Sequence, residues 1–153
     1  MSHCCVKERW GEEGLAGAEQ PAGSVRVDKH LVDSSVLVDF SLGRGEAAEF
    51  FESMSESAIL VHPAAEAEVL VGARDRDELE LLRELLGRFR RVRVTTDDFD
   101  HCLAFVRRLT LSHGVGWPDC LIAATALRLS VPVVTINDKH FRAIRGLRVV
   151  RPY

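Results

Sequence analysis

Three aspartates stand where their carboxylates could act together on a metal ion. Asp33 follows the short apolar run "HLV", Asp119 precedes a nearly continuous apolar run at 121–129, and Asp138 follows "VPVVTI". Clustered carboxylates repel one another, and their pKa values rise unless a cation lies among them. Hard oxygen ligands without His or Cys suit Mg²⁺ or Mn²⁺ rather than zinc. Such a centre can activate water and stabilise the leaving oxygen of a phosphodiester, so the pattern points to phosphoryl-transfer hydrolysis.

Each aspartate also has a plainer interpretation. An aspartate at a helix start, such as Asp119, is most often a cap or a partner of the helix dipole, and Asp138 in "IND" fits a turn. Asp33 is harder to explain in this way, because an acid at the end of an apolar strand is buried and needs a partner. Each signal is weak alone, and the placement of all three at one edge of a sheet favours an active site.

Glu66 and Glu68 compete for another acidic position on a helix that Pro63 opens. The inward stripe of that helix includes Ala65 and Val69. Glu68 is adjacent to this stripe, whereas Glu66 lies closer to the solvent side. The spacing therefore favours Glu68, and a solvated surface glutamate is the alternative.

Strands and helices alternate along the chain, which predicts an α/β domain with a mostly parallel sheet and helices on its faces. In such a sheet, ligands bind in the crevice outside the carboxyl ends of the strands, where residues 33, 119 and 138 would converge. The predicted strands are at 30–32, 58–62, 92–96, 131–136 and 147–150. The predicted helices are at 36–40, 45–57, from 63, at 77–86 with Gly87 as its end, at 97–113 with Thr96 or Asp97 as its cap, at 119–129 and at 139–144.

The chain of 153 residues fits a single domain at 30–153, preceded by a tail at 1–29 that we expect to be disordered. Its formal net charge of −3 gives no global attraction to nucleic acid or to an anionic membrane. No apolar run approaches the length that spans a bilayer, and the N-terminus lacks the apolar segment of a secretory signal. The four cysteines form no C-x-x-C motif. These features favour a reduced, cytoplasmic protein.

Four sequence blocks resemble the signature blocks of PIN-domain ribonucleases in order and spacing. They are "LVDSSVLVDF", "AEVLVGA", "PDCLIAATAL" and "VVTINDKHFRAIRGLRV". The closest likeness is to the VapC toxins of bacterial toxin–antitoxin pairs, and it runs from about Leu31 to the C-terminus. The resemblance implies a PIN-like three-layer sandwich, with a mostly parallel central sheet and helices on both faces.

The resemblance also assigns roles to residues. It makes Asp33 and Asp119 metal ligands and selects Glu68 over Glu66 as the next acidic member. The family's usual Asp or Asn two residues after the threonine of the last block is Asn137 here, and Asp138 comes one residue later. Either Asp138 supplies the fourth carboxylate, giving a catalytic set of Asp33, Glu68, Asp119 and Asp138, or Asn137 is a neutral ligand. Ser35 and Thr135 would orient the carboxylates through their hydroxyl groups.

What the resemblance implies about function is a Mg²⁺- or Mn²⁺-dependent endoribonuclease that acts as the toxin of a toxin–antitoxin pair. Such toxins usually form homodimers, and a small antitoxin protein silences them. An acidic centre alone repels RNA, so basic surface must flank it. "RFRRVR" at 88–93 and the basic C-terminal region, with Lys139, Arg142 and Arg145, are the candidates for contact with RNA phosphates, and solvated surface arginines are the alternative.

Two other interpretations stay open from the sequence. The first is a PIN-fold protein-binding module whose catalytic site has decayed, which the substitution at the fourth acidic position would explain. The second is a receiver-type phosphorylation domain, for which Lys139 would fit. That class also needs an aspartate at the end of a central strand midway along the chain, and the sequence has none there.

Overall fold

The computed structural model describes residues 28–153, so the predicted tail lies outside the described residues apart from its last two positions. In this part of the chain, five strands form one sheet in the order β3-β2-β1-β4-β5. The strands are β1 (His30–Val32), β2 (Ile59–Val61), β3 (Arg90–Arg91), β4 (Val133–Val134) and β5 (Val149–Val150). The helices are α1 (Ser34–Ser41), α2 (Gly45–Glu52), the 3₁₀ turn η1 (Glu56–Ala58), α3 (Pro63–Val71), α4 (Arg76–Leu86), α5 (Thr96–His113), α6 (Trp117–Leu129) and α7 (Asp138–Arg142).

Every neighbouring pair of strands in the sheet is parallel, which confirms the predicted α/β class. The chain builds the sheet outward from β1 through β2 to β3, and then returns to place β4 on the other side of β1. Val32 at the end of β1 lies beside Val61 of β2 and Val134 of β4. The order of the strands therefore reverses between β1 and β4. In open parallel sheets, this reversal is where the connecting segments diverge and leave a crevice at the carboxyl ends.

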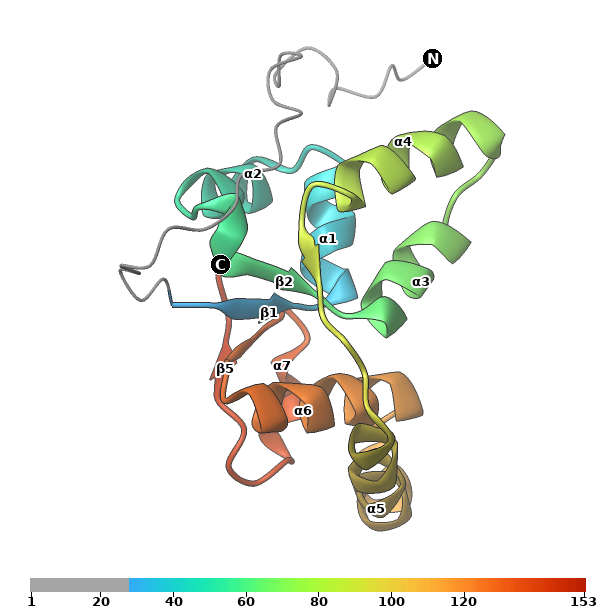
Figure 1. Cartoon of the computed structure of the whole chain (residues 1–153), viewed down its shortest axis with the longest axis vertical. Helices are drawn as coiled ribbons and strands as arrows, with labels where there is room; N and C mark the ends of the chain where they lie inside the picture. The colour runs from blue at the N-terminus through green and yellow to red at the C-terminus, as the bar shows by residue number, and fades with distance from the viewer. Residues whose placement is uncertain (1–27) are drawn as a thin grey trace.

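Helices cover the sheet on both sides (Figure 1). In this view α1, α3 and α4 lie on one side of β1 and β2, and α5 and α6 lie on the other. At one end of the sheet, α3 also packs against α6, so the two helix layers meet there. The expected three-layer arrangement is confirmed, and the meeting of α3 and α6 places their side chains beside the strand ends.

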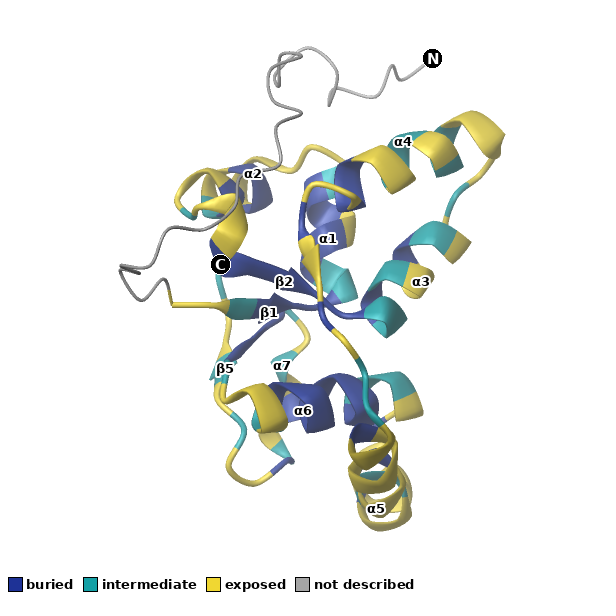
Figure 2. Cartoon of the chain, in the orientation of Figure 1, coloured by how far each residue is buried: buried dark blue, intermediate teal, exposed yellow. Residues whose placement is uncertain are grey.

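Helix α6 is the most completely buried helix among the described residues (Figure 2). All residues from Cys120 to Ala126 are buried, and the three alanines among them let neighbouring elements approach closely. Burying this apolar face holds the start of α6 at a fixed place. Asp119, which directly precedes the buried segment, is held there as well.

Most predicted boundaries agree with the structure within a few residues, and β3 is an exception. The strand predicted at 92–96 is wrong, because β3 is Arg90–Arg91. The Val92 N–H still donates to the Val61 carbonyl, at 3.0 Å, before the chain turns away. Thr95 then caps α5 in a reciprocal capping box with Asp98, so the predicted cap at Thr96 or Asp97 is also wrong. Asp98, three residues after Thr95, thus fixes where α5 begins, and the residues just before the helix do not continue β3.

Three other predicted helix ends agree with the structure. Pro63 is the first residue of α3, and Gly87 follows the last residue of α4. Gly114 ends α5 with a φ of 66°, a left-handed conformation that glycine adopts without steric penalty. No helix between residues 28 and 153 has the length and apolar character needed to cross a membrane.

Candidate active site

Asp33 lies at the carboxyl end of β1, and only 4% of it is exposed. Two hydroxyl groups donate to its Oδ2 atom: Ser35 Oγ at 2.8 Å and Thr135 Oγ1 at 2.9 Å. Ser35 is in the first turn of α1, and Thr135 directly follows β4. The reversal of strand order between β1 and β4 brings these residues together. The buried carboxylate is therefore held in one orientation at the carboxyl ends of β1 and β4.

Asp119 lies in the first turn of α6 but does not cap it. Gly116 occupies the capping position, and no side chain of the described residues 28–153 caps this helix. Instead, Asp119 Oδ2 lies 2.9 Å from Nδ1 of His140 on α7. An ionised carboxylate can only accept, so Nδ1 carries the hydrogen and donates it. The other oxygen, Oδ1, accepts no hydrogen bond from any residue at 28–153.

The pKa of Asp119 responds to its burial and to the charges of two other acids. Burial raises the pKa of Asp119, because a charged carboxylate loses its water shell there. The hydrogen bond from His140 lowers this pKa, whereas the negative charges of Asp33 and Glu68 raise it further. Glu68 comes from α3, which packs against α6. The structure thus brings Asp33, Glu68 and Asp119 close enough for their charges to interact, from three different elements.

The two glutamates of α3 have different surroundings. The Glu66 carboxylate lies 3.3 Å from Nε of Arg91 on β3, which neutralises its charge. Glu68 is exposed to solvent and lies within electrostatic range of Asp119. Glu66, expected closer to the solvent side, is thus half-buried, and Glu68, expected beside the inward stripe, is exposed, so this part of the prediction is wrong. The role of Glu68 as a member of the acidic site stays a prediction, which its electrostatic effect on Asp119 favours.

Asp138 and Asn137 do not join the three acids through their side chains. Asp138 is the first residue of α7, and Arg142 donates to it at 2.6 Å, which lowers the pKa of Asp138. The Asn137 side chain is exposed, and its backbone N–H donates to Thr135 Oγ1 at 3.0 Å. The side chain from this segment that reaches Asp119 is His140, which the sequence analysis did not select. The signal in the sequence that could have identified His140 is its position one helical turn after Asn137.

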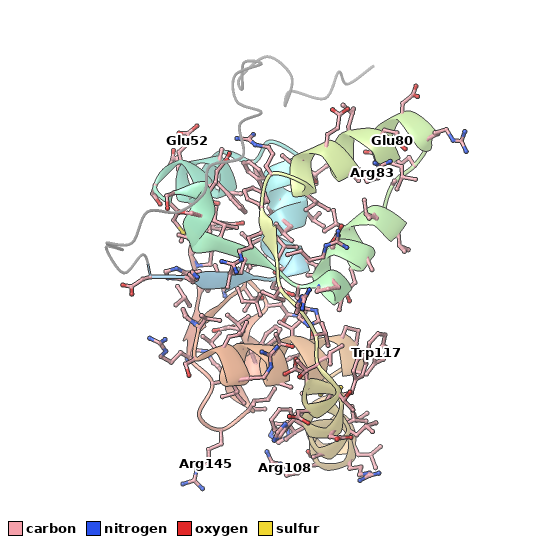
Figure 3. The ribbon with its side chains drawn as sticks, viewed as in Figure 1. Glu52, Glu80, Arg83, Arg108, Trp117 and Arg145 are labelled. Carbon is pink, nitrogen blue, oxygen red and sulfur yellow. The ribbon has the colours of Figure 1, made fainter. Side chains whose placement is uncertain are left out.

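The predicted RNA contacts differ in their surroundings. Lys139 is exposed, whereas Arg142 is paired with Asp138. Arg145 projects away from the body of the protein, on the side opposite the start of α6 at Trp117 (Figure 3). In the "RFRRVR" cluster, Arg88 forms an ion pair with Glu56, and Arg91 pairs with Glu66 as described above.

The donor chemistry of the site fits a hard divalent cation. Within residues 28–153, no three Asp, Glu, His or Cys side chains lie in a group that could hold a metal ion as they stand. The fit instead depends on the nature of the donors, which are three carboxylates whose charges interact. One of them, Asp119, has a raised pKa and one oxygen that accepts no hydrogen bond from the described residues. A cation among them would relieve their repulsion. Oxygen donors of this kind suit Mg²⁺ or Mn²⁺.

The fold and the site together define an α/β protein with an acidic site at the carboxyl edge of an all-parallel sheet. A sequence model of the PIN domain matches residues 30–147. The chain therefore belongs to the PIN domain family, as the sequence resemblance implied.

Solved structures of this class resemble the chain over most of its length. A toxin–antitoxin complex from Klebsiella pneumoniae contains a chain of 28% identity with a TM-score of 0.68, and the alignment covers 82% of this protein and 98% of that chain. A DNA-bound VapBC from Salmonella typhimurium has 21% identity and a TM-score of 0.69, and the alignment covers 82% of this protein and 99% of that chain. VapC20 of Mycobacterium tuberculosis, described as a sarcin–ricin loop cleaving toxin, has 15% identity and a TM-score of 0.65. That alignment covers 81% of this protein and 100% of that chain. A comparison with curated proteins gives no match.

Proposed function

We propose that this protein is a divalent-metal-dependent endoribonuclease and the toxin component of a toxin–antitoxin pair. The observation that carries the proposal is the electrostatic grouping of Asp33, Glu68 and Asp119 at the strand reversal of a PIN domain. The resemblance to VapC toxins and to the toxin–antitoxin complex from Klebsiella pneumoniae supports the biological role.

The reaction would be hydrolysis of an RNA phosphodiester bond. A water oxygen forms a bond to phosphorus, the bond from phosphorus to the leaving ribose oxygen breaks, and a water proton ends on that leaving oxygen. Asp33, Glu68 and Asp119 would hold Mg²⁺ or Mn²⁺, which when bound activates water and neutralises charge on the phosphate. Ser35 and Thr135 keep the Asp33 carboxylate in place through the hydrogen bonds described above.

RNA must approach this acidic site along basic surface. Exposed Lys139, at the start of α7, is the best placed of the three predicted phosphate contacts, because α7 packs against α6 beside Asp119. Arg142 would have to exchange Asp138 for a phosphate. Arg145 points away from α6 and would contact only RNA that extends beyond the site.

The proposed partners are a small antitoxin protein and a second copy of the chain. Large apolar side chains are exposed on the α5–α6 side, including Phe99 at 49%, Leu103 at 51% and Trp117 at 60%. Exposed apolar side chains of this size are common at protein interfaces. Light scattering of the purified protein, alone and with its antitoxin, would measure both associations.

The decisive experiment is cleavage of total bacterial RNA by the wild-type protein and by Asp119→Asn, with Mg²⁺, with Mn²⁺ and with EDTA. We expect discrete fragments that require a metal ion and Asp119. If a folded, antitoxin-free sample cuts no RNA with either metal, the protein is instead a PIN-fold binding module that has lost its activity.

A further inference from the structure

We infer that His140 is a positioning residue of the acidic site, which holds one oxygen of Asp119 so that the other is presented to a divalent cation. The inference rests on the proposed function, because it concerns how the same site is arranged. It assigns a role to a side chain that the acidic pattern of the sequence does not include.

The segment from Thr135 to His140 reaches both the buried Asp33 and the partly buried Asp119. At its beginning, the Thr135 hydroxyl donates to Asp33 at 2.9 Å. At its end, His140 donates to Asp119 at 2.9 Å. Between them, the Asn137 N–H donates to Thr135 Oγ1 at 3.0 Å and fixes the turn that leads into α7. One short stretch of chain thus sets the positions of two carboxylates that come from β1 and α6.

The His140 ring is held firmly enough to act in this way. The next residue, Phe141, is only 1% exposed and anchors α7 in the core. Helix α7 packs against both α6 and β5. The His140 side chain itself is 28% exposed and that of Asp119 is 22% exposed, so the bond is partly shielded from water. A shielded hydrogen bond between a charged acceptor and an anchored donor orients the carboxylate.

The consequence for cation binding follows from the two oxygens of Asp119. Oδ2 accepts from His140, and within the described residues Oδ1 has no hydrogen-bond partner. Hydrogen bonds to ligating carboxylates typically contribute about 10- to 100-fold to metal affinity. We therefore expect His140→Ala to raise the dissociation constant for Mn²⁺ by about tenfold or more. In His140→Asn, the amide nitrogen takes nearly the same position as Nδ1, so this variant should bind within about threefold of the wild type.

The test is direct binding of Mn²⁺ alone, without RNA, measured by the loss of the free-ion electron paramagnetic resonance signal. The samples are the full-length wild type, His140→Ala, His140→Asn and Asp119→Asn. His101→Ala is the matched control, because His101 is an exposed histidine on α5 whose ring hydrogen-bonds to the Asp97 carbonyl of its own helix. Thermal melts of each protein verify that it is folded.

Weaker binding by His140→Ala, recovery by His140→Asn and no change in His101→Ala would support the inference. If His140→Ala binds Mn²⁺ as well as the wild type does, or if His140→Asn fails to recover binding, the positioning role is wrong while the acidic site stands. If Asp119→Asn binds as well as the wild type, or if the wild type binds no cation, the proposed metal site itself is wrong.

Discussion

Acidification should destabilise this protein through one buried histidine. His62 follows β2, is 0% exposed and caps α3, the helix that carries Glu68. Its Nδ1 accepts the Ala64 N–H at 3.0 Å, so this nitrogen carries no hydrogen. Its Nε2–H is left to donate to Thr125 Oγ1 on α6, at 3.2 Å. A second proton on the ring would break the cap and place a charge inside the core.

The size of the effect follows from the shift in pKa. Burial lowers the pKa of His62 from 6.5 to about 4. Between these values the unfolded chain binds a proton that the folded protein does not, so the free energy of unfolding falls as the pH falls. The stabilising contribution is fully present above pH 6.5. It decreases by about 2 kcal/mol at pH 5 and by about 3 kcal/mol at pH 4.

Urea unfolding followed by circular dichroism at pH 7.5, 6.5, 5 and 4 measures this loss. His62→Asn keeps an acceptor suited to the cap but has no proton to gain, so its stability should depend less on pH. The gap between wild type and His62→Asn should therefore shrink on acidification by the amounts given above. The exposed His101→Asn variant serves as control and should follow the wild type. Parallel stability curves for wild type and His62→Asn would refute the reasoning.

Three further predictions concern single carboxylates and their partners. Arg128→Met should lower the free energy of unfolding by about 3 kcal/mol in urea titrations, because it leaves the charge of Asp98, 1% exposed in its side chain, without its two bonds to Arg128. Asp119→Asn should raise the stability of the protein in EDTA by about 0.5 kcal/mol in thermal melts, since ionised Asp119 is partly buried near other acids. Asp138→Asn should slow RNA cleavage by less than about tenfold in single-turnover assays, because Asp138 is paired with Arg142.

Each of these outcomes has a clear opposite. Wild-type stability of Arg128→Met would mean that water replaces the lost bonds. A less stable Asp119→Asn in EDTA would mean that its bond with His140 outweighs the repulsion. A loss of cleavage in Asp138→Asn as large as that in Asp119→Asn would make Asp138 the fourth carboxylate after all.

The sequence predicted the features that depend on short-range pattern and on the general geometry of parallel sheets. Asp33 and Asp119 could be placed together because strand ends and helix starts share one edge of such a sheet. The burial expected for the two glutamates of α3 was wrong, because Glu66 is half-buried and paired with Arg91 whereas Glu68 is exposed. The hydroxyls of Ser35 and Thr135 also lie where the resemblance placed them.

The parts that escaped prediction depend on packing between distant elements. The partnership of His140 with Asp119 requires α7 to sit against α6 in a particular rotation, which a five-residue helix does not reveal in its pattern. For the same reason, the sequence could not decide between Asn137 and Asp138. The position of β3 depended on competition between an edge strand and the capping box at Thr95.

The return of β4 to the side of β1 has a consequence for synthesis. Asp33 and its partner Thr135 are 102 residues apart, so the contact closes a very long loop. Contacts of such high sequence separation carry a loop-closure entropy cost and slow folding. On the ribosome, β1, β2 and β3 emerge well before β4 and α7, which lie near the C-terminus. A nascent chain therefore displays Asp33 beside Ser35 before it contains Thr135 and His140, which complete the hydrogen bonds to Asp33 and Asp119.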